Sequence, residues 1–439
     1  MKNILIILVC KIISWISRIF NLGSGSTWPG HIALSLNKKF IRQVINKNNH
    51  LKIIVIAGTN GKTTSTALLK YLLDKSGYRV FTNSEGANLL NGVASSIIKN
   101  SNYISKLNFD YVIFESDELN LPILLKEISP DKILILNLFR DQLDRYGEVN
   151  SIALKWLESL KTLDDKTEVF INGDDPQLYH IGTMLSGKVK YFGIEKKLMK
   201  LKYVPNDVDS IYCPVCLSLL KYDLLSYAHL GDFYCPNCKF KRLGKKVSDL
   251  SDIKISYPMS GLYNVYNTNA VLLLIKSLVN IDMTDINKWL KEFVPAFGRQ
   301  EEIVYKNRKV FILLSKNPAG FNQSIQTVHE MVKNKKANFL IILNNRIPDG
   351  LDVSWIWDVN FKPILDVANN IYIAGDRVYD MNLRLRYEDS KSNIDTFVDL
   401  PKAVDEIVKN TKDGEKFYVL PTYSAMLEVR KILLGRKLL

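Results

Sequence analysis

Residues 52–75, KIIVIAGTNGKTTSTALLKYLLDK, decide the fold of this chain. An apolar run ends at Gly58, a short polar segment follows, and apolar residues then recur at helical spacing between Ala67 and Leu73. A buried parallel strand that feeds a loop and then a helix has this pattern. The usual phosphate-binding loop, G-x-x-x-x-G-K-[ST], would place its first glycine at position 56, where this chain has Ile56. The stretch therefore raises the question of whether a shorter loop binds phosphate here.

The residues of this loop supply what a phosphate site needs, which is free backbone N–H groups, a helix N-terminus and a cation. Glycines allow the backbone to approach a phosphate, Lys62 can reach the β- and γ-phosphates, and the Thr63 hydroxyl can bind Mg²⁺. The alternative is a strand–turn–helix without a ligand. The predicted ATP-binding residues are Gly58, Thr59, Asn60, Gly61, Lys62, Thr63 and Thr64.

Strand-like and helix-like segments alternate along the rest of the chain, which is typical of an α/β fold. The predicted strands after the loop are 78–82, 110–115, 132–137 and 167–171, and then 309–314, 338–343, 370–374 and 416–420. A helical N-terminal segment is expected at 1–50, and a central ATP-binding domain with a mostly parallel sheet at 51–295. The Pro- and Gly-containing segment VPAFGRQEE (294–302) is expected to mark a boundary, followed by a smaller α/β domain at 296–439.

The chain has 439 residues and a formal net charge of +14, which favours an acidic partner. Nucleic acid, an anionic membrane surface and a phosphorylated substrate all fit, and the charge alone does not choose among them. Near the N-terminus, Ile4 to Cys10 form an apolar run that is too short to span a bilayer and is followed by Lys11 and Arg18. This segment is either a helix docked on the protein or a helix at a membrane surface.

Carboxylates suitable for Mg²⁺ lie at the end of the predicted strand 110–115, in YVIFESDELN (111–120). Ligands of open α/β sheets bind at the carboxyl ends of the strands, so Glu115, Asp117 and Glu118 are candidates. An acidic first turn of the next helix would explain one or two of these acids. It explains Glu115 less well, because Glu115 closes an apolar strand. Glu115, together with Thr63, is the predicted Mg²⁺ ligand.

Two C-x-x-C pairs, separated by 18 residues, predict a metal site in a polar insertion at about 205–245. Four thiolates fill the coordination sphere of Zn²⁺, so the ion is expected to be structural. His229, between the pairs, is expected at the surface, and the remaining Cys10 in the core. A redox role for either pair is the alternative, and the pattern fits a reducing compartment. The predicted zinc ligands are Cys213, Cys216, Cys235 and Cys238.

The loop sequence AGTNGKTT (57–64) resembles that of the Mur ligase family, whose short phosphate loop reads G-T-N-G-K-T. Further stretches are similar to family motifs: NLFRDQLDRYGE (137–148), NGDDP (172–176), GLYNVYNTNA (261–270) and FGRQE (297–301). The resemblance implies that Asn264 and Asn267 contact adenine and that Arg299 contacts a phosphate or the ribose. It also implies a Mur ligase-like central domain, with the zinc ribbon inserted in it.

Three other features point to one branch of that family, the MurT subunits. Only about 50 residues precede the first strand, which leaves no UDP-sugar-binding domain, and LSKNPAGFNQ (314–323) stands where the peptide-adding ligases have a Y-A-H-N-P type sequence. The third feature is DGLDVSWIWD (349–358), and GSGSTWPGHIAL (23–34) adds to the match. This resemblance implies ATP-dependent amidation of the D-glutamate α-carboxylate of lipid II through an acyl phosphate. It further implies ammonia from a separate glutaminase subunit, GatD, and a cytoplasmic enzyme at the inner face of the plasma membrane.

The segment DGLDVSWIWD has two interpretations. It could be a loop into a short amphipathic helix with Asp352 as its N-cap. Alternatively, an aspartate here could reach the glutaminase and orient its histidine, since a Cys–His pair gains from a third group that fixes the imidazole. Asp352 is the predicted catalytic residue on the second interpretation, and Asp349 is the next candidate. The tryptophans Trp355 and Trp357 would then be interface anchors, although core packing suits one of them equally.

Two rival functions follow from the same residues. A stand-alone amino-acid ligase of the Mur or folylpolyglutamate type would turn over ATP with an amino acid and no partner. A nucleic-acid-binding ATPase with a zinc ribbon would use the positive charge, but the chain lacks an interleaved aromatic and basic binding motif. The expected ligands are therefore ATP, Mg²⁺, structural Zn²⁺ and lipid II, with no nucleic acid.

Overall fold

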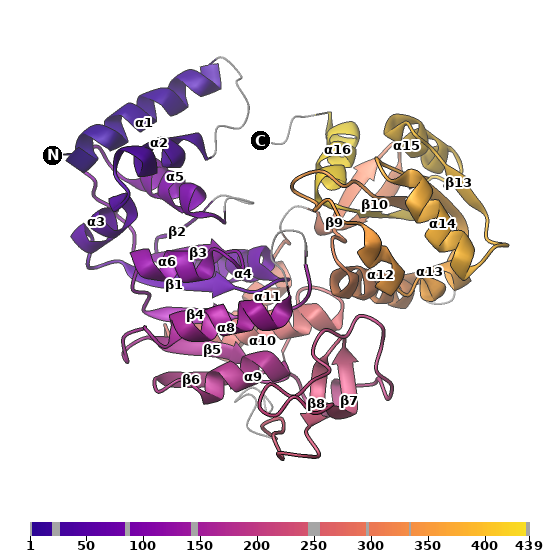
Figure 1. Cartoon of the computed structure of the whole chain (residues 1–439). Coiled ribbons are helices and arrows are strands. Elements are labelled where there is room, and N and C mark those ends of the chain that lie inside the picture. The colour runs from indigo at the N-terminus through magenta and orange to yellow at the C-terminus, as the bar shows by residue number, and fades with distance from the viewer. Residues whose placement is uncertain are drawn as a thin grey trace.

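The computed structural model describes residues 2–19, 27–83, 88–141, 148–244, 255–295, 298–332 and 335–435. Two six-stranded sheets, each covered by helices on both faces, make up most of it, and a two-stranded hairpin lies beside the first sheet (Figure 1). The first part comprises α1 (Lys2–Ile19), α2 (Trp28–Leu36), α3 (Phe40–Lys47), β1 (Lys52–Ala57), α4 (Lys62–Lys75), β2 (Val80–Thr82), α5 (Leu90–Asn100), β3 (Tyr111–Ser116), α6 (Leu121–Glu127), β4 (Lys132–Ile135), α8 (Val149–Leu160), β5 (Glu168–Asn172), α9 (Pro176–Thr183), β6 (Lys188–Phe192), β7 (Lys221–Tyr227), β8 (Leu230–Tyr234), α10 (Leu262–Lys276) and α11 (Met283–Glu292).

The central sheet has the strand order β2-β3-β1-β4-β5-β6, and all its strands are parallel. Alternate residues of β1 enter different cores: Ile54 and Ile56 pack with α4 and α10, and Ile53 and Val55 pack with α3, α5 and α6. A strand that is apolar on both faces is what the run before Gly58 predicts. Because β1, β3 and β4 end at the same edge, the loop after β1 lies where open α/β sheets bind ligands.

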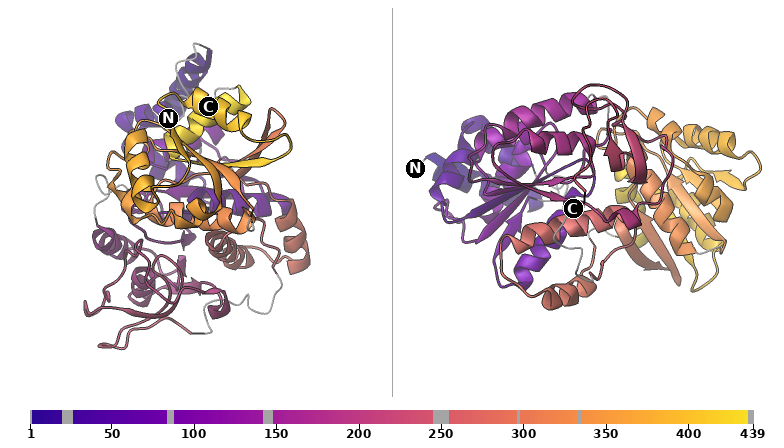
Figure 2. Two further views of the ribbon diagram at one scale, coloured as in Figure 1. Left: turned by 90° about the vertical axis from the view of Figure 1, so that its right-hand side faces the viewer. Right: turned by 90° about the horizontal axis from the view of Figure 1, so that it is seen from below.

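The second sheet, with the order β13-β12-β11-β14-β10-β9, forms a smaller α/β unit. We call residues 298–435 the C-terminal unit. Its helices cover both faces of its sheet (Figure 2). Its elements are β9 (Arg299–Tyr305), β10 (Arg308–Leu313), α12 (Pro318–Val332), β11 (Ala337–Ile342), η2 (Ser354–Asp358), α13 (Lys362–Val367), β12 (Ala368–Ala374), α14 (Val378–Glu388), β13 (Ile394–Thr396), α15 (Leu400–Lys409), β14 (Lys416–Pro421) and α16 (Tyr423–Leu434). The predicted α/β class, with a mostly parallel central sheet and a C-terminal α/β unit, is confirmed.

Five strands were not predicted from the sequence: β6, β9 and β13 of the two large sheets, and β7 and β8 of the hairpin. β9 begins at Arg299, inside the segment predicted as a boundary, and pairs antiparallel with β10 at the edge of the second sheet. Its residues are mostly polar and partly exposed, so it lacks the apolar run that reveals a central strand. The boundary predicted at 295/296 adjoins residues 296–297, which lie outside the described residues, and the division into domains stays a prediction.

Parts of three other predicted segments lie outside the described residues: 142–147 of the stretch 137–148, 245–254 at the end of the insertion, and 23–26 before α2. At the N-terminus, α1 buries Ile6, Ile7 and Cys10, so Cys10 occupies a core position as expected. Among the described helices, none is both long enough and apolar enough to span a membrane.

Candidate functional site

The loop after β1 is shaped by two glycines with positive φ, Gly58 at +144° and Gly61 at +88°. A Cβ on Gly61 would lie 2.3 Å from the Asn267 amide oxygen, so a side chain there would displace α10 from the loop. The end of β4 holds the other side of the loop. The Asn137 side chain accepts from the Asn60 N–H (2.8 Å) and donates to the Asn60 carbonyl (2.9 Å). The loop is therefore fixed from both sides in a shape that only glycine permits at position 61.

Lys62 and Thr63 begin α4 directly after this loop and face carboxylates of β3 and the turn after it. Lys62 Nζ donates to the Gly58 carbonyl (2.6 Å) and lies 3.4 Å from Asp117 and 3.8 Å from Glu118. The Thr63 hydroxyl donates to Glu115 Oε2 at 3.0 Å. Thr63 and Glu115 thus place two hard oxygen ligands side by side, which suits Mg²⁺, whereas Asp117 and Glu118 face the lysine.

Arg299 lies next to the same hydroxyl although it is distant in sequence, since its Nη2 donates to Thr63 Oγ1 at 3.0 Å. This position favours a phosphate contact for Arg299 over a ribose contact. Burial raises the pKa of Glu115, although the Arg299 guanidinium opposes the shift. A cation bound between Glu115 and Thr63 would favour the ionised form of this carboxylate.

Asn264 and Asn267 lie on the first turns of α10, where the family motif predicts an adenine contact. The Asn264 side chain donates to the Ser260 carbonyl at 2.8 Å, and both asparagines line the same cavity as the loop. Gln300, which the sequence did not single out, donates to the Tyr263 hydroxyl at 2.7 Å and has a left-handed backbone with φ +59°. Strained residues of this kind cluster at ligand sites.

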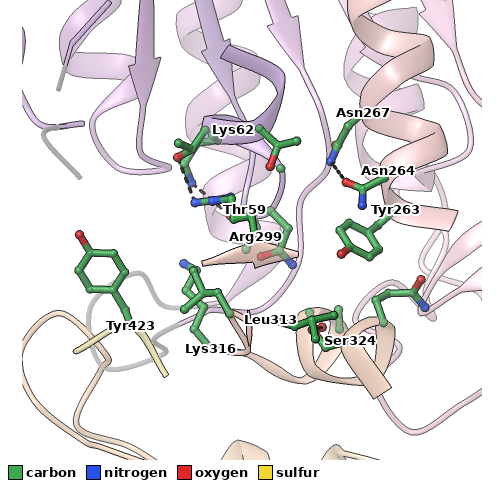
Figure 3. A pocket seen from close by; sticks show the side chains of 18 of the residues that line it. Thr59, Lys62, Tyr263, Asn264, Asn267, Arg299, Leu313, Lys316, Ser324 and Tyr423 are labelled. Atoms are coloured by element: carbon green, nitrogen blue, oxygen red, sulfur yellow. Dashed lines mark hydrogen bonds between the residues drawn. The ribbon is translucent and has the colours of Figure 1, made fainter. Parts of the chain in front are cut away.

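The cavity has a volume of about 380 Å³ and is closed by residues of the C-terminal unit. Leu313, Lys316, Ser324 and Tyr423 of this unit line the cavity, and Figure 3 shows them on the side opposite Lys62 and Asn267. Two pairs join the units here: the Asn60 and Asn317 side chains exchange hydrogen bonds of 3.1 and 3.2 Å, and Lys316 Nζ donates to Asp141. Every residue predicted to bind ATP or magnesium, except Gly58, therefore lines one cavity. Lys316 also lines this cavity, but the sequence analysis did not identify it as a site residue.

Two charged groups at this cavity have shifted pKa values. Burial raises the pKa of Glu118 to about 8. The nearby Asp117 and Asp141 carboxylates add to this upward shift, and the Lys62 ammonium group opposes it. For Lys316, burial lowers the pKa, but the carboxylates of Asp141, Glu118 and Asp117 outweigh it and the net shift is upward. Lys316 is therefore a partly buried cation that stays protonated at neutral pH and pairs with Asp141.

The two candidate aspartates of the segment 349–358 differ in exposure. Asp349 is buried and accepts hydrogen bonds from the Ser424 N–H (2.7 Å) and hydroxyl. Asp352 is exposed, and its carboxylate accepts from the Ser354 N–H (2.8 Å) and hydroxyl (2.9 Å). The N-cap of η2 is Val353, so Asp352 stands one residue before the position expected for a cap. Asp349 therefore stabilises the fold through its hydrogen bonds to Ser424, whereas the Asp352 side chain is exposed to solvent.

The tryptophans in that segment also differ. Trp355 packs partly against Phe321, and Trp357 is 45% exposed, with the Arg384 guanidinium 5.4 Å from its ring centroid. A small cavity of about 40 Å³ lies under this segment, with Asp352, Trp355 and Lys316 in its wall. Because Lys316 lines both cavities, the outward-facing aspartate lies close to the nucleotide site.

The four paired cysteines come together at the base of the β7–β8 hairpin. Their sulfur atoms all lie within 4.8 Å of one another, with 3.5 Å between Cys213 and Cys238 and 3.4 Å between Cys216 and Cys235. Ligands at the Zn–S bond length of about 2.3 Å would have tetrahedral edges of about 3.8 Å. The donor set and its closeness thus fit one four-coordinate zinc ion.

His229, in the turn of this hairpin, is not at the surface as expected. It is fully buried, its Nε2 lies 3.3 Å from Asp175 Oδ2, and its ring packs against Phe139. The hairpin turn inserts into the central unit, where His229 meets Asp175, the N-cap of α9. The neighbouring Asp174 binds Arg242, which follows the hairpin, at 2.6 Å. Nothing in the residues around His229 distinguishes such a turn from an exposed one.

Comparisons with known proteins match both parts of the chain. Residues 56–275 match the model of the Mur ligase middle domain, and residues 314–426 match that of the MurT ligase C-terminal region. The chain is 32% identical over 434 residues to the lipid II isoglutaminyl synthase (glutamine-hydrolyzing) subunit MurT of Streptococcus pneumoniae, covering 95% of this chain and 94% of that one. It is 29% identical to the corresponding subunit of Staphylococcus aureus, with 92% and 91% covered.

Among solved structures, the fold resembles a pseudomurein peptide ligase type C from Methanothermus fervidus, with a TM-score of 0.65, 20% identity and coverage of 92% and 84% of the two chains. It also resembles the MurF ligase from Thermotoga maritima in complex with ADP, with a TM-score of 0.62, 17% identity and coverage of 93% and 83%. At these identities the similarity establishes the Mur ligase fold.

We expect the purified chain to contain about one zinc ion, because four clustered thiolates leave no open coordination position. Cys235→Ser should lower the zinc content to well under half an ion per chain and lower the melting temperature, since the hairpin packs on the central unit through His229. Elemental analysis and thermal denaturation measure both. Cys10→Ser is the matched control and should leave the zinc content unchanged. Full zinc occupancy in Cys235→Ser would contradict the assignment.

Proposed function

The chain belongs to the MurT family of lipid II isoglutaminyl synthase subunits, and on this premise we propose how its cavity amidates lipid II. It is a ligase that forms a carbon–nitrogen bond with glutamine as the amide donor, and it acts in peptidoglycan synthesis. The substrate is the α-carboxylate of the D-glutamate residue, which becomes D-isoglutamine. The observation that carries the proposal is the cavity in which Lys62 of the central unit meets Arg299 and Lys316 of the C-terminal unit.

The reaction needs two steps because a carboxylate is a poor electrophile. First, a carboxylate oxygen attacks the γ-phosphorus of ATP, the bond to the β–γ bridging oxygen breaks, and ADP leaves. The nitrogen of ammonia then attacks the carbonyl carbon of the acyl phosphate, the C–O bond breaks, phosphate leaves and the nitrogen loses a proton. The protein must position the reactants and screen their negative charges.

The cationic residues divide this work by position. Lys62 and the loop N–H groups would hold the β- and γ-phosphates, and Arg299 would contact the γ-phosphate beside Thr63. Asn264, Asn267 and Tyr263, at the far side of the loop, would hold adenine. Thr63 and Glu115 would bind Mg²⁺, which neutralises phosphate charge when present.

Lys316 would bind the glutamate carboxylate and then the acyl phosphate. It comes from the C-terminal unit, opposite the loop, and its raised pKa keeps it charged. It also lines the small cavity beneath Asp352, through which ammonia would arrive. A carboxylate and a γ-phosphate repel each other, so a cation between them lowers the cost of bringing them together.

The relatives are named as subunits, and a partner subunit therefore accompanies this chain. We identify it as a GatD-type glutaminase that releases ammonia from glutamine. Asp352 would complete the partner's Cys–His pair by orienting the imidazole. Its exposure and its place beside the small cavity support this role, whereas Asp349 is bound to Ser424. The substrate is a lipid, so the complex would work at the inner face of the plasma membrane, without nucleic acid.

With the partner subunit, lipid II and ATP, we expect either glutamine or ammonium to give amidated lipid II, detected by mass spectrometry. The chain alone should give the product with ammonium and none with glutamine, since glutaminase chemistry belongs to the partner. If amino acids, rather than ammonium, were joined to the substrate, the chain would instead be a stand-alone amino-acid ligase.

Two substitutions should separate the roles of Lys316 and Glu115. Lys316→Met should reduce ammonium-driven kcat/KM by about 10²–10³-fold, the usual cost of losing one charge-stabilising group, with the Mg²⁺ requirement unchanged. Glu115→Gln should raise the Mg²⁺ concentration needed for half-maximal activity. Lys309→Met, an exposed lysine of the same unit, is the control for Lys316 and should keep full activity. A shifted Mg²⁺ requirement in Lys316→Met would contradict its assignment.

Asp352→Asn should abolish glutamine-driven amidation while sparing ammonium-driven amidation, because it acts on the partner's histidine. The two rates, measured on the same complex, give the result directly. Asp349→Asn is the comparison: loss of its bonds to Ser424 should lower the melting temperature and both rates together. Equal loss of both rates in Asp352→Asn, with an intact complex, would rule out the positioning role.

A further inference from the structure

Helix α1 is apolar on two opposite faces. One face, with Ile6, Ile7 and Cys10, is buried in the core of the central unit. The other face consists of side chains spaced three or four residues apart that are 37–66% exposed: Leu5, Leu8, Val9, Ile12 and Trp15. Isolated exposed apolar residues are ordinary, but a contiguous apolar stripe on one helix marks a surface that binds something.

The charge around this stripe has one sign. Residues 1–51 contain seven basic residues and no Asp or Glu, so they contribute +7 of the +14 formal charge from about an eighth of the chain. Lys2, Lys38, Lys39 and Lys47 are exposed, and Lys2 and Lys47 line a cavity of about 200 Å³ between α1 and α3. An apolar stripe beside unopposed cations complements an anionic lipid surface.

We propose that the exposed face of α1, defined by Leu5, Leu8, Val9, Ile12 and Trp15, docks the enzyme on an anionic membrane. The apolar stripe would enter the headgroup boundary, with Trp15 at the depth where tryptophan is favoured and the lysines on the phosphate groups. This inference goes beyond the amidation reaction, because it concerns where the enzyme meets its lipid substrate.

The position of α1 suits that role. α1 packs on α2 and α5, and Asn88 and Leu89, just before α5, line the nucleotide cavity. One helix, α5, thus separates α1 from a segment that lines the nucleotide cavity. α1 lies at the end of the molecule far from α13, which follows the segment 349–358 (Figure 1). A glutaminase placed at Asp352 would therefore leave the stripe uncovered.

The test uses the complete complex and sedimentation with vesicles of phosphatidylcholine, with or without phosphatidylglycerol. We expect binding to the anionic vesicles, weaker binding at high salt, and little binding to phosphatidylcholine alone. Leu5→Ser combined with Ile12→Ser should weaken binding by about a hundredfold, at roughly tenfold for each buried side chain lost. Both side chains are exposed, so the fold should be unaffected.

Leu154→Ser is the matched control, because Leu154 on α8 and Leu5 are both 63% exposed. It should bind vesicles like the unaltered complex. The double variant should amidate a water-soluble lipid II analogue at the normal rate but lose activity on lipid II in vesicles, which separates this proposal from the amidation assignment. Normal vesicle binding by the double variant, or loss of the partner subunit from it, would overturn the proposal, the latter in favour of a protein interface.

Discussion

The ion pair between Lys316 and Asp141 directly links the two α/β units at the wall of the nucleotide cavity. Removing one partner of a buried pair leaves an uncompensated charge, at a cost of about 3–5 kcal/mol. The neighbouring residue Asn317 pairs with Asn60 of the loop, and α12 begins at Pro318. The positive end of the α12 dipole therefore points into the cavity beside Lys316, where both a phosphate and a carboxylate would be stabilised.

A second constraint lies in the NGDDP motif, whose two aspartates join elements that are distant in the sequence. Asp174 accepts from Arg242 of the hairpin and from the Tyr266 hydroxyl of α10, while Asp175 accepts from the Leu138 N–H beyond β4. Helix α10, the cysteine-bearing insertion and the segment that anchors the loop after β1 thus share one buried acidic pair. A zinc ion held by the four cysteines would support this pair, because it would fix the hairpin whose turn supplies His229.

The sequence predicted features that are local in the chain. The phosphate loop, the order of the main strands and the cysteine pairs all depend on spacing within a few residues, and periodicity or ligand chemistry reveals them. Lys316 and Gln300 gain their roles only when the second unit folds against the first, which no local pattern encodes. His229 was misplaced for the same reason. Its burial follows from a contact with Asp175, 54 positions earlier in the chain.

The space around Lys316 bears on which nucleophile the enzyme accepts. The cavity beneath Asp352 offers about 40 Å³, room for a few molecules the size of water. Ammonia fits such a space, whereas an amino acid needs a larger one with groups for its own carboxylate, and on the proposed mechanism the cations of the larger cavity would serve ATP and the glutamate. A partner docked at Asp352 would deliver ammonia next to Lys316, where the acyl phosphate would be held. Cavity size and charge together thus favour formation of a primary amide over a peptide bond.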